Sequence, residues 1–206
     1  MKCWKCSVLV VLSGALALNS WSLAAESAAT PRSIIEKVMQ DVLAVLRDTK
    51  LTKPEKNEKV RSIAFQTMDF EVLARLALGA YWRNLSDDQH KEFVAEFRKH
   101  VAATYGHTVD EYTDEDINVV GDREEVRGDW TVQTRIMGMK EGKKQEVAKV
   151  DYRLRQKDQQ WKIIDVTIDG VSLMANFRAQ FKDIMENGGY DRLIKMLKDK
   201  NADSGK

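Results

Sequence analysis

Side chains that commonly carry catalytic or metal chemistry are few in this 206-residue chain, and their spacing matches no catalytic motif. The three histidines, His90, His100 and His107, lack the HExxH pattern and any other ligand spacing. The two cysteines, Cys3 and Cys6, both lie at the extreme N-terminus. Because a zinc or related site needs several such ligands at fixed spacing, the sequence predicts no metal site and no bound cofactor.

Ser172 is the residue that comes closest to a catalytic nucleophile. It follows a predicted strand and precedes a predicted helix, like the serine of a G-x-S-x-G nucleophile elbow. The segment reads GVSLM over residues 170–174, however, so the second glycine of the motif is missing. We therefore interpret Ser172 as a helix-capping serine, and Asp165 and Asp169 as surface or capping groups.

An isomerase-like or lyase-like enzyme is the main alternative, because a cone-shaped sheet can hold an aspartate base and a tyrosine donor in an apolar interior. Such an enzyme needs a carboxylate on the apolar face of the sheet. Strand alternation places Asp151, Asp165 and Asp169 on the polar face instead. We therefore predict that the chain has no catalytic residues and is not an enzyme.

Helical periodicity occupies the N-terminal half and the C-terminal end of the mature chain. The capping signals are Thr30-Pro31, the Thr52–Glu55 box, Asp69 and the Ser86–Gln89 box, with Gly79 and Gly106 as stops. The first helix carries an apolar stripe of Ile35, Val38, Met39, Val42, Leu43 and Leu46. A C-terminal helix is expected to open at Val171 and Ser172 and to break at Gly188-Gly189.

From about residue 115 to 169 the apolar residues no longer recur at helical spacing but at every second position. Strands are predicted over residues 117–120, 129–138, 146–156 and 160–169. Short connections around Gly142 and residues 157–159 favour an antiparallel meander, and one-sided alternation favours helices on a single face. The predicted fold class is therefore α+β, with a curved antiparallel sheet of about four strands covered on one face by N- and C-terminal helices.

The N-terminus is typical of an export signal. Lys2 and Lys5 precede an apolar run from Ser7 to Leu18, and Ser22-Leu23-Ala24 offers a cleavage site. We predict that residues 1–24 are removed, that residues 25–200 form one domain, and that residues 201–206 form a flexible tail; a retained interfacial anchor is the alternative. The mature chain has 31 basic and 32 acidic residues, a net charge of −1. This balance disfavours a nucleic-acid binder, which would carry a basic excess.

Three segments of the mature chain resemble the motifs of one known family. They read LALGAYWRNLSDDQ over residues 76–89, followed by Phe93, Phe97 and Tyr105, then DGVSLMANFRAQF over residues 169–181, and GGYDRLIK over residues 188–195. In this order they resemble the MlaC or toluene-tolerance family of periplasmic phospholipid-binding proteins. The resemblance extends from about residue 34 to residue 200.

The resemblance implies a cystatin/NTF2-like sheet and a monomeric periplasmic carrier that encloses the acyl chains of a diacyl phospholipid. It also implies two membrane partners, an outer-membrane lipoprotein–porin complex and an inner-membrane ABC transporter complex with a lipid-binding subunit. Shuttling lipid between them would maintain the lipid asymmetry of the outer membrane. A periplasmic chaperone or adaptor that binds proteins through a Met/Phe surface is the remaining alternative.

For such a carrier, the lipid-binding residues are expected on the inward strand face and on the aromatic helix faces. They are Leu76, Tyr81, Trp82, Phe97, Val101, Tyr105, Val132, Thr134, Ile136, Val150, Tyr152, Ile164, Val166, Ile168, Val171, Met174, Phe177 and Phe181. Tyr81 and Trp82 would line the pocket mouth, dock a partner or pack in the core. Met174, Phe177 and Phe181 share one face of a helix that would cover the lipid, so Phe177→Glu or Val171→Glu should harm lipid loading more than folding.

Overall fold

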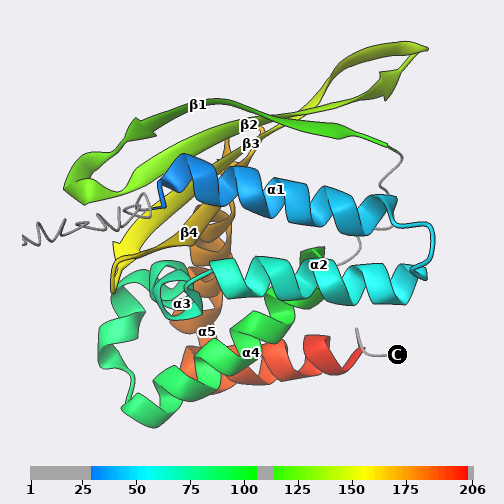
Figure 1. The fold of residues 1–206 in the computed structure, drawn as a ribbon. Coiled ribbons are helices and arrows are strands. Elements are labelled where there is room, and N and C mark those ends of the chain that lie inside the picture. Colours follow the sequence, from blue (N-terminus) through cyan, green and yellow to red (C-terminus); the bar gives the residue numbers. More distant parts are fainter. Residues whose placement is uncertain (1–28, 106–113, 204–206) are drawn as a thin grey trace, which may run out of the picture.

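The structure is a computed structural model in which residues 29–105 and 114–203 are described. Its elements, in chain order (Figure 1), are α1 (Pro31–Arg47), α2 (Lys53–Thr67), α3 (Phe70–Leu78), η1 (Gly79–Asn84), α4 (Asp87–Tyr105), β1 (Asp116–Glu124), η3 (Val126–Gly128), β2 (Trp130–Lys140), β3 (Lys143–Lys157), β4 (Gln160–Ile168), β5 (Val171–Ser172) and α5 (Leu173–Asp203). The predicted α+β class is confirmed. The predicted signal peptide, the stop at Gly106 and the last three residues of the predicted tail lie outside the described residues.

The sheet is an antiparallel meander in the order β1-β2-β3-β4-β5. Its register aligns Val132, Tyr152 and Val166 across β2, β3 and β4, so these three side chains share one face. The row next to them contains Trp130, Leu154 and Ile163. Figure 1 shows the helices gathered on a single side of the sheet, as the alternation predicts. We call this covered side the inner face.

The end of the sheet corrects the predicted start of the C-terminal helix. Val171 and Ser172 form the short strand β5 against Ile168 and Thr167, and α5 begins at Leu173. Asp169 and Gly170 adopt positive φ values of 47° and 87°, which turn the chain back along β4. The sheet of the described residues therefore has five strands, where the sequence predicts about four.

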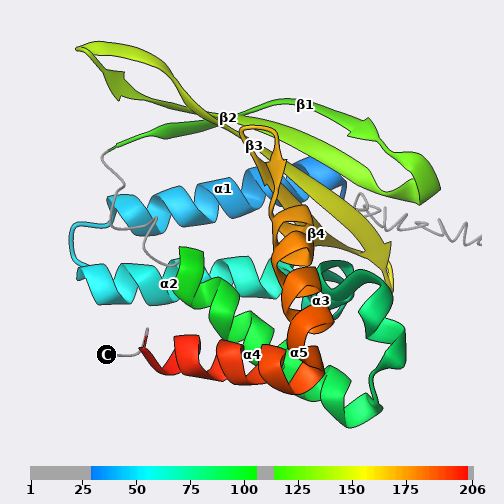
Figure 2. The same cartoon turned by 180° about the vertical axis from the view of Figure 1, so that it is seen from behind.

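Helix α5 has two parts that meet at Gly189, whose φ of 67° and ψ of −166° are non-helical. The break predicted at Gly188-Gly189 is therefore confirmed. Figure 2 shows the first part descending from the sheet and the second part turning to run beside α4. The helix continues through Asp203, past Asn201 where the sequence predicts a flexible tail, because the Asn201 amide donates to the Glu96 carbonyl at 3.1 Å and to its carboxylate at 2.8 Å. None of the helices in the described ranges has the length and apolar composition needed to cross a bilayer.

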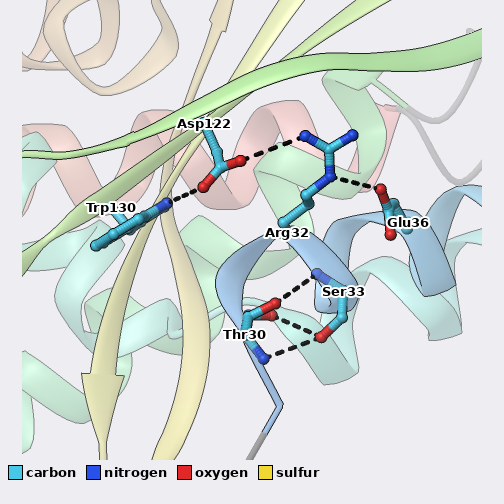
Figure 3. Close-up of polar contacts among 6 residues, drawn as sticks. All are labelled: Thr30, Arg32, Ser33, Glu36, Asp122 and Trp130. Atoms are coloured by element: carbon cyan, nitrogen blue, oxygen red, sulfur yellow. Dashed lines mark hydrogen bonds and ion pairs between the residues drawn. The ribbon is translucent and has the colours of Figure 1, made fainter.

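Helix α1 lies antiparallel to β1 and is attached to it at both ends. Figure 3 shows Arg32 bridging Glu36 at 2.8 Å and Asp122 at 3.4 Å, while the Trp130 indole donates to Asp122 at 2.8 Å. At the other end, Arg47 donates to Asp116 at 2.7 Å. These contacts hold α1 across the inner face of the sheet.

Asp129 precedes β2, and two arginines bind its fully buried carboxylate. Arg155 donates to it at 2.6 and 2.8 Å, and Arg153 lies at 2.7 Å. Burial alone would raise the pKa of this carboxyl, but the hydrogen bonds and charges of Arg155 and Arg153 outweigh burial and hold the pKa below its ordinary value.

We expect Asp129→Asn to lower the free energy of unfolding by about 2 kcal/mol, because both arginines lose their charged partner while staying partly solvated. Because the folded-state pKa is lowered, this contribution is present above the unfolded pKa of about 4 and is lost as pH falls through the folded pKa. Denaturant titrations at pH 7 and pH 3 measure it, and the stability gap between wild type and variant should shrink at pH 3. Asp151→Asn is the control, since Asp151 lies 3.5 Å from its arginine partner. If Asp129→Asn and Asp151→Asn lowered the free energy of unfolding equally, the stabilising role assigned to the Asp129 ion pairs would be contradicted.

Candidate functional site

Two separate apolar clusters lie beneath the sheet. The first, which we call the helical core, joins α3, α4 and α5 and contains the buried residues Phe70, Leu73, Ala74, Ala77, Leu78, Phe93, Phe97, Met174, Phe177, Phe181, Leu193, Ile194 and Leu197. The second, the sheet core, packs α1 against the inner face and contains Ile35, Met39, Val132, Leu154 and Ile163. Of the half-buried side chains, Met68 contacts both clusters.

The helical core is organised around a group of aromatic rings. Phe177 makes an edge contact with Phe97 at a centroid distance of 5.0 Å and stacks on Phe181 at 5.5 Å. Phe93 adds a further edge contact to Phe181 at 5.8 Å. Phe177 and Phe181 are only 3% and 1% exposed, and Met174 is 5% exposed. The three residues predicted to cover a lipid therefore pack into the helical core.

The apolar stripe of α1 changes its burial along the helix. Ile35 and Met39 are 0% and 7% exposed in the sheet core. Val42 and Leu46 follow on the same face, one and two turns further on, but remain only half-buried. Helix α2, which packs on α1, contributes no fully buried residue. The C-terminal half of α1 thus presents apolar surface that the described residues do not fill.

On the inner face of the sheet, apolar side chains near the C-terminal end of α1 are also only half-buried. Ile117 pairs with Ile136 across β1 and β2, and both are half-buried. Ile168 and Val166 on β4 are half-buried as well. We define the half-buried patch as Val42, Leu46, Ile117, Ile136, Tyr152, Val166 and Ile168. Because Arg47 ties the end of α1 to Asp116 beside Ile117, the helix and strand parts of this patch lie close together.

The predicted lipid-binding residues are divided between the patch and other places. Four belong to the patch: Ile136, Tyr152, Val166 and Ile168. Val132, Thr134 and Val150 are buried on the inner face beside it, and Leu76, Val101 and Tyr105 are half-buried around the helical core. Val42, Leu46 and Ile117 were not among the predicted binding residues, because a helical stripe and a short strand gave no sign of incomplete burial.

Four further predicted residues lie away from the patch. Val171 is 60% exposed on the edge strand β5. Ile164 is 1% exposed and sits at the bulge of β4, where the register against β3 shifts. Tyr81 donates to Glu186 at 3.3 Å, and Trp82 stacks on the His90 ring at 4.0 Å. These last two contacts favour the packing interpretation of Tyr81 and Trp82.

The groups that superficially suggest catalysis form a helix cap. Ser172 donates to Asp165 at 2.6 Å and accepts from the backbone N–H of Ala175 at 3.0 Å. Asp165 also accepts from the N–H of Met174 at 3.2 Å. The capping interpretation of Ser172 and Asp165 is confirmed. Within the described ranges, no group of three or more His, Cys, Asp or Glu residues is placed to hold a metal ion.

Two surface pockets of about 500 and 830 Å³ meet at Phe70 and Arg98. The Arg98 guanidinium lies 4.8 and 5.3 Å from the ring centroids of Phe65 and Phe70. Charged side chains, including Lys157 and Lys91, line both pockets. Acyl chains are disfavoured in the smaller pocket, whose exposed lining is mainly polar, because charged groups lose hydration against hydrocarbon.

Comparison with known proteins assigns the family. The family model described as MlaC protein matches residues 36–199. The chain belongs to the MlaC family. Toluene tolerance protein ttg2D of Pseudomonas putida is 24% identical to this MlaC-family chain over 180 residues, covering 84% of the chain and 81% of that protein.

A solved structure shares the fold of this MlaC-family chain. It is the phospholipid-binding protein of Ralstonia solanacearum, determined in complex with a phospholipid. The two structures superpose with a TM-score of 0.73 at 22% sequence identity, over 86% of this chain and 100% of the other. The family resemblance and the curved antiparallel sheet expected from the sequence are therefore confirmed.

Proposed function

We propose that this MlaC-family protein is a periplasmic phospholipid carrier that holds the acyl chains of a diacyl lipid against the half-buried patch. The observation that carries the proposal is the incomplete burial of apolar side chains on both α1 and the inner face. The Ralstonia solanacearum protein binds a phospholipid, and we take the class of ligand from that structure. Membership of the MlaC family supports the same ligand class.

The energetic reason for a carrier is the insolubility of its cargo. A diacyl lipid has roughly 30 methylene groups, each worth about 0.8 kcal/mol on transfer out of water. Free passage through an aqueous compartment therefore carries a penalty on the order of 20 kcal/mol. A protein that shields both chains lowers this penalty without any chemical reaction, so the function needs no catalytic residue.

The proposal extends to location and partners. The signal-like N-terminus supports export to the periplasm, and there the carrier would exchange lipid between an outer-membrane lipoprotein–porin complex and an inner-membrane ABC transporter complex. In the sequence we find no nucleotide-binding motif. Any directional energy would therefore come from the partners.

The direct test is the lipid content of the purified protein. We expect organic extraction followed by mass spectrometry to recover diacyl phospholipid at about one molecule per chain, because shielded chains dissociate slowly into water. After delipidation in denaturant and refolding, the protein should take lipid from vesicles. A protein that purifies without lipid and also fails to load from vesicles would contradict the proposal.

A further inference from the structure

Tyr152 is a polar side chain in the middle of an otherwise apolar surface. It lies on β3 between Val132 on β2 and Val166 on β4, on the inner face. Its ring packs against the sheet core beneath α1. It is nevertheless only half-buried, so part of its surface borders space that protein atoms do not fill.

Other polar side chains on this face have partners within the protein. Thr134 donates to the Val150 carbonyl at 2.7 Å, and the Trp130 indole donates to Asp122 at 2.8 Å. No described residue donates a hydrogen bond to the Tyr152 hydroxyl or accepts one from it. Burial raises the pKa of its hydroxyl well above the ordinary value, so the group stays protonated and keeps its donor proton. The hydroxyl oxygen keeps some accessible surface, so its donor proton is open to an acceptor that enters this space.

We propose that the Tyr152 hydroxyl donates a hydrogen bond to an ester carbonyl of the bound diacyl phospholipid. This inference rests on the proposed carrier function. The ester carbonyls are the polar atoms that adjoin the acyl chains directly, and they are neutral acceptors without a donor of their own. The phosphate is a poorer match, because moving its charge into an apolar interior costs much more than moving a carbonyl. Tyr152 is then a positioning residue that fixes how far the chains enter the site.

The proposal predicts a preference between two lipids that differ only in their linkage. Delipidated protein is offered vesicles with equal amounts of a diester and a diether phosphatidylethanolamine of the same chain length, and bound lipid is measured by mass spectrometry. Wild type should prefer the diester by about fivefold, the value of one neutral hydrogen bond. Tyr152→Phe removes only the oxygen, so it should bind both lipids about equally. Tyr81→Phe, whose hydroxyl bonds Glu186 instead, should keep the wild-type preference.

The outcomes separate this inference from the proposed function. Equal uptake of the two lipids by wild type, or an unchanged preference in Tyr152→Phe, overturns the ester contact while leaving the carrier function intact. Uptake of neither lipid by wild type overturns the carrier function itself. The wild-type comparison needs no variant, so the inference stays testable even if Tyr152→Phe melts at a lower temperature.

Discussion

Val42→Trp is expected to weaken phospholipid binding by more than about tenfold while leaving the protein folded. The indole would occupy space beside the half-buried Val42 side chain, between α1 and the sheet. Displacing only two methylene groups of an acyl chain removes about 1.6 kcal/mol of transfer free energy, which exceeds a tenfold change in binding. In a filled core the same substitution would cost about 1–3 kcal/mol of stability through overpacking. A site with unfilled space avoids most of that cost.

The measurement is the partition of lipid between vesicles and delipidated protein, quantified by mass spectrometry and run beside a thermal melt. Ala44→Trp is the matched control, because Ala44 is exposed on the same helix two residues away. Ile168→Trp tests the opposite wall, on β4, and should lower lipid content in the same way. Wild-type lipid content in both patch variants, with unchanged melting temperatures, would place the acyl chains elsewhere in the molecule.

The helix starts could be predicted because their signals are local. Thr30 and Ser33 bond each other's backbone at 2.9–3.1 Å, and Asp69 accepts from the Val72 N–H at 3.0 Å. The Ser86–Gln89 box is present too, with hydrogen bonds of 2.9 and 3.3 Å. Each of these contacts joins residues three positions apart, so sequence spacing alone contains the information. The alternation of apolar and polar residues along β2 and β3 is also a local signal, because residues two positions apart share one face of the sheet.

Alternation alone does not predict which face of the sheet each β4 side chain occupies along the whole strand. A bulge shifts the register between β3 and β4, so that Ile163 pairs with Leu154 while Asp165 pairs with Arg153. Strict alternation from Ile168 places Ile164 on the inner face, yet Ile163 is the residue found in the sheet core. An inserted residue reverses the facing of every position beyond it. Nothing in the composition of the strand marks where the insertion occurs.

Core and ligand site could not be separated in the sequence for a different physical reason. Both consist of apolar side chains at regular spacing, and only long-range packing decides which are covered. Val42 and Met39 share one stripe on α1, yet Met39 is 7% exposed and Val42 is half-buried. The difference depends on how α2 and the sheet meet around the helix, which the spacing of the stripe does not encode.

Phe177 shows how this distinction changes an expected result. The sequence pattern assigns Phe177 to a helix that covers the lipid, so a charge there should harm lipid loading more than folding. In the structure its ring contacts Phe97 and Phe181 in the helical core and also lies 5.8 Å from the His100 ring. Phe177 is 3% exposed, so a glutamate would be buried among uncharged rings, because burial lowers the pKa of His100 below its ordinary value.

Phe177→Glu is therefore expected to prevent folding rather than to empty a folded carrier. Truncation of a buried phenylalanine alone costs about 3–5 kcal/mol, and the buried carboxylate adds a desolvation penalty. Together these approach or exceed the 5–15 kcal/mol stability typical of a domain. Phe177→Leu, which keeps the site apolar, should fold with a lowered melting temperature and still load lipid. Soluble yield, near-ultraviolet circular dichroism and lipid content of the two variants distinguish a failure to fold from a loss of lipid. If the Phe177→Glu protein melts cooperatively near the wild-type temperature but holds no lipid, Phe177 belongs to the acyl site and not to the helical core.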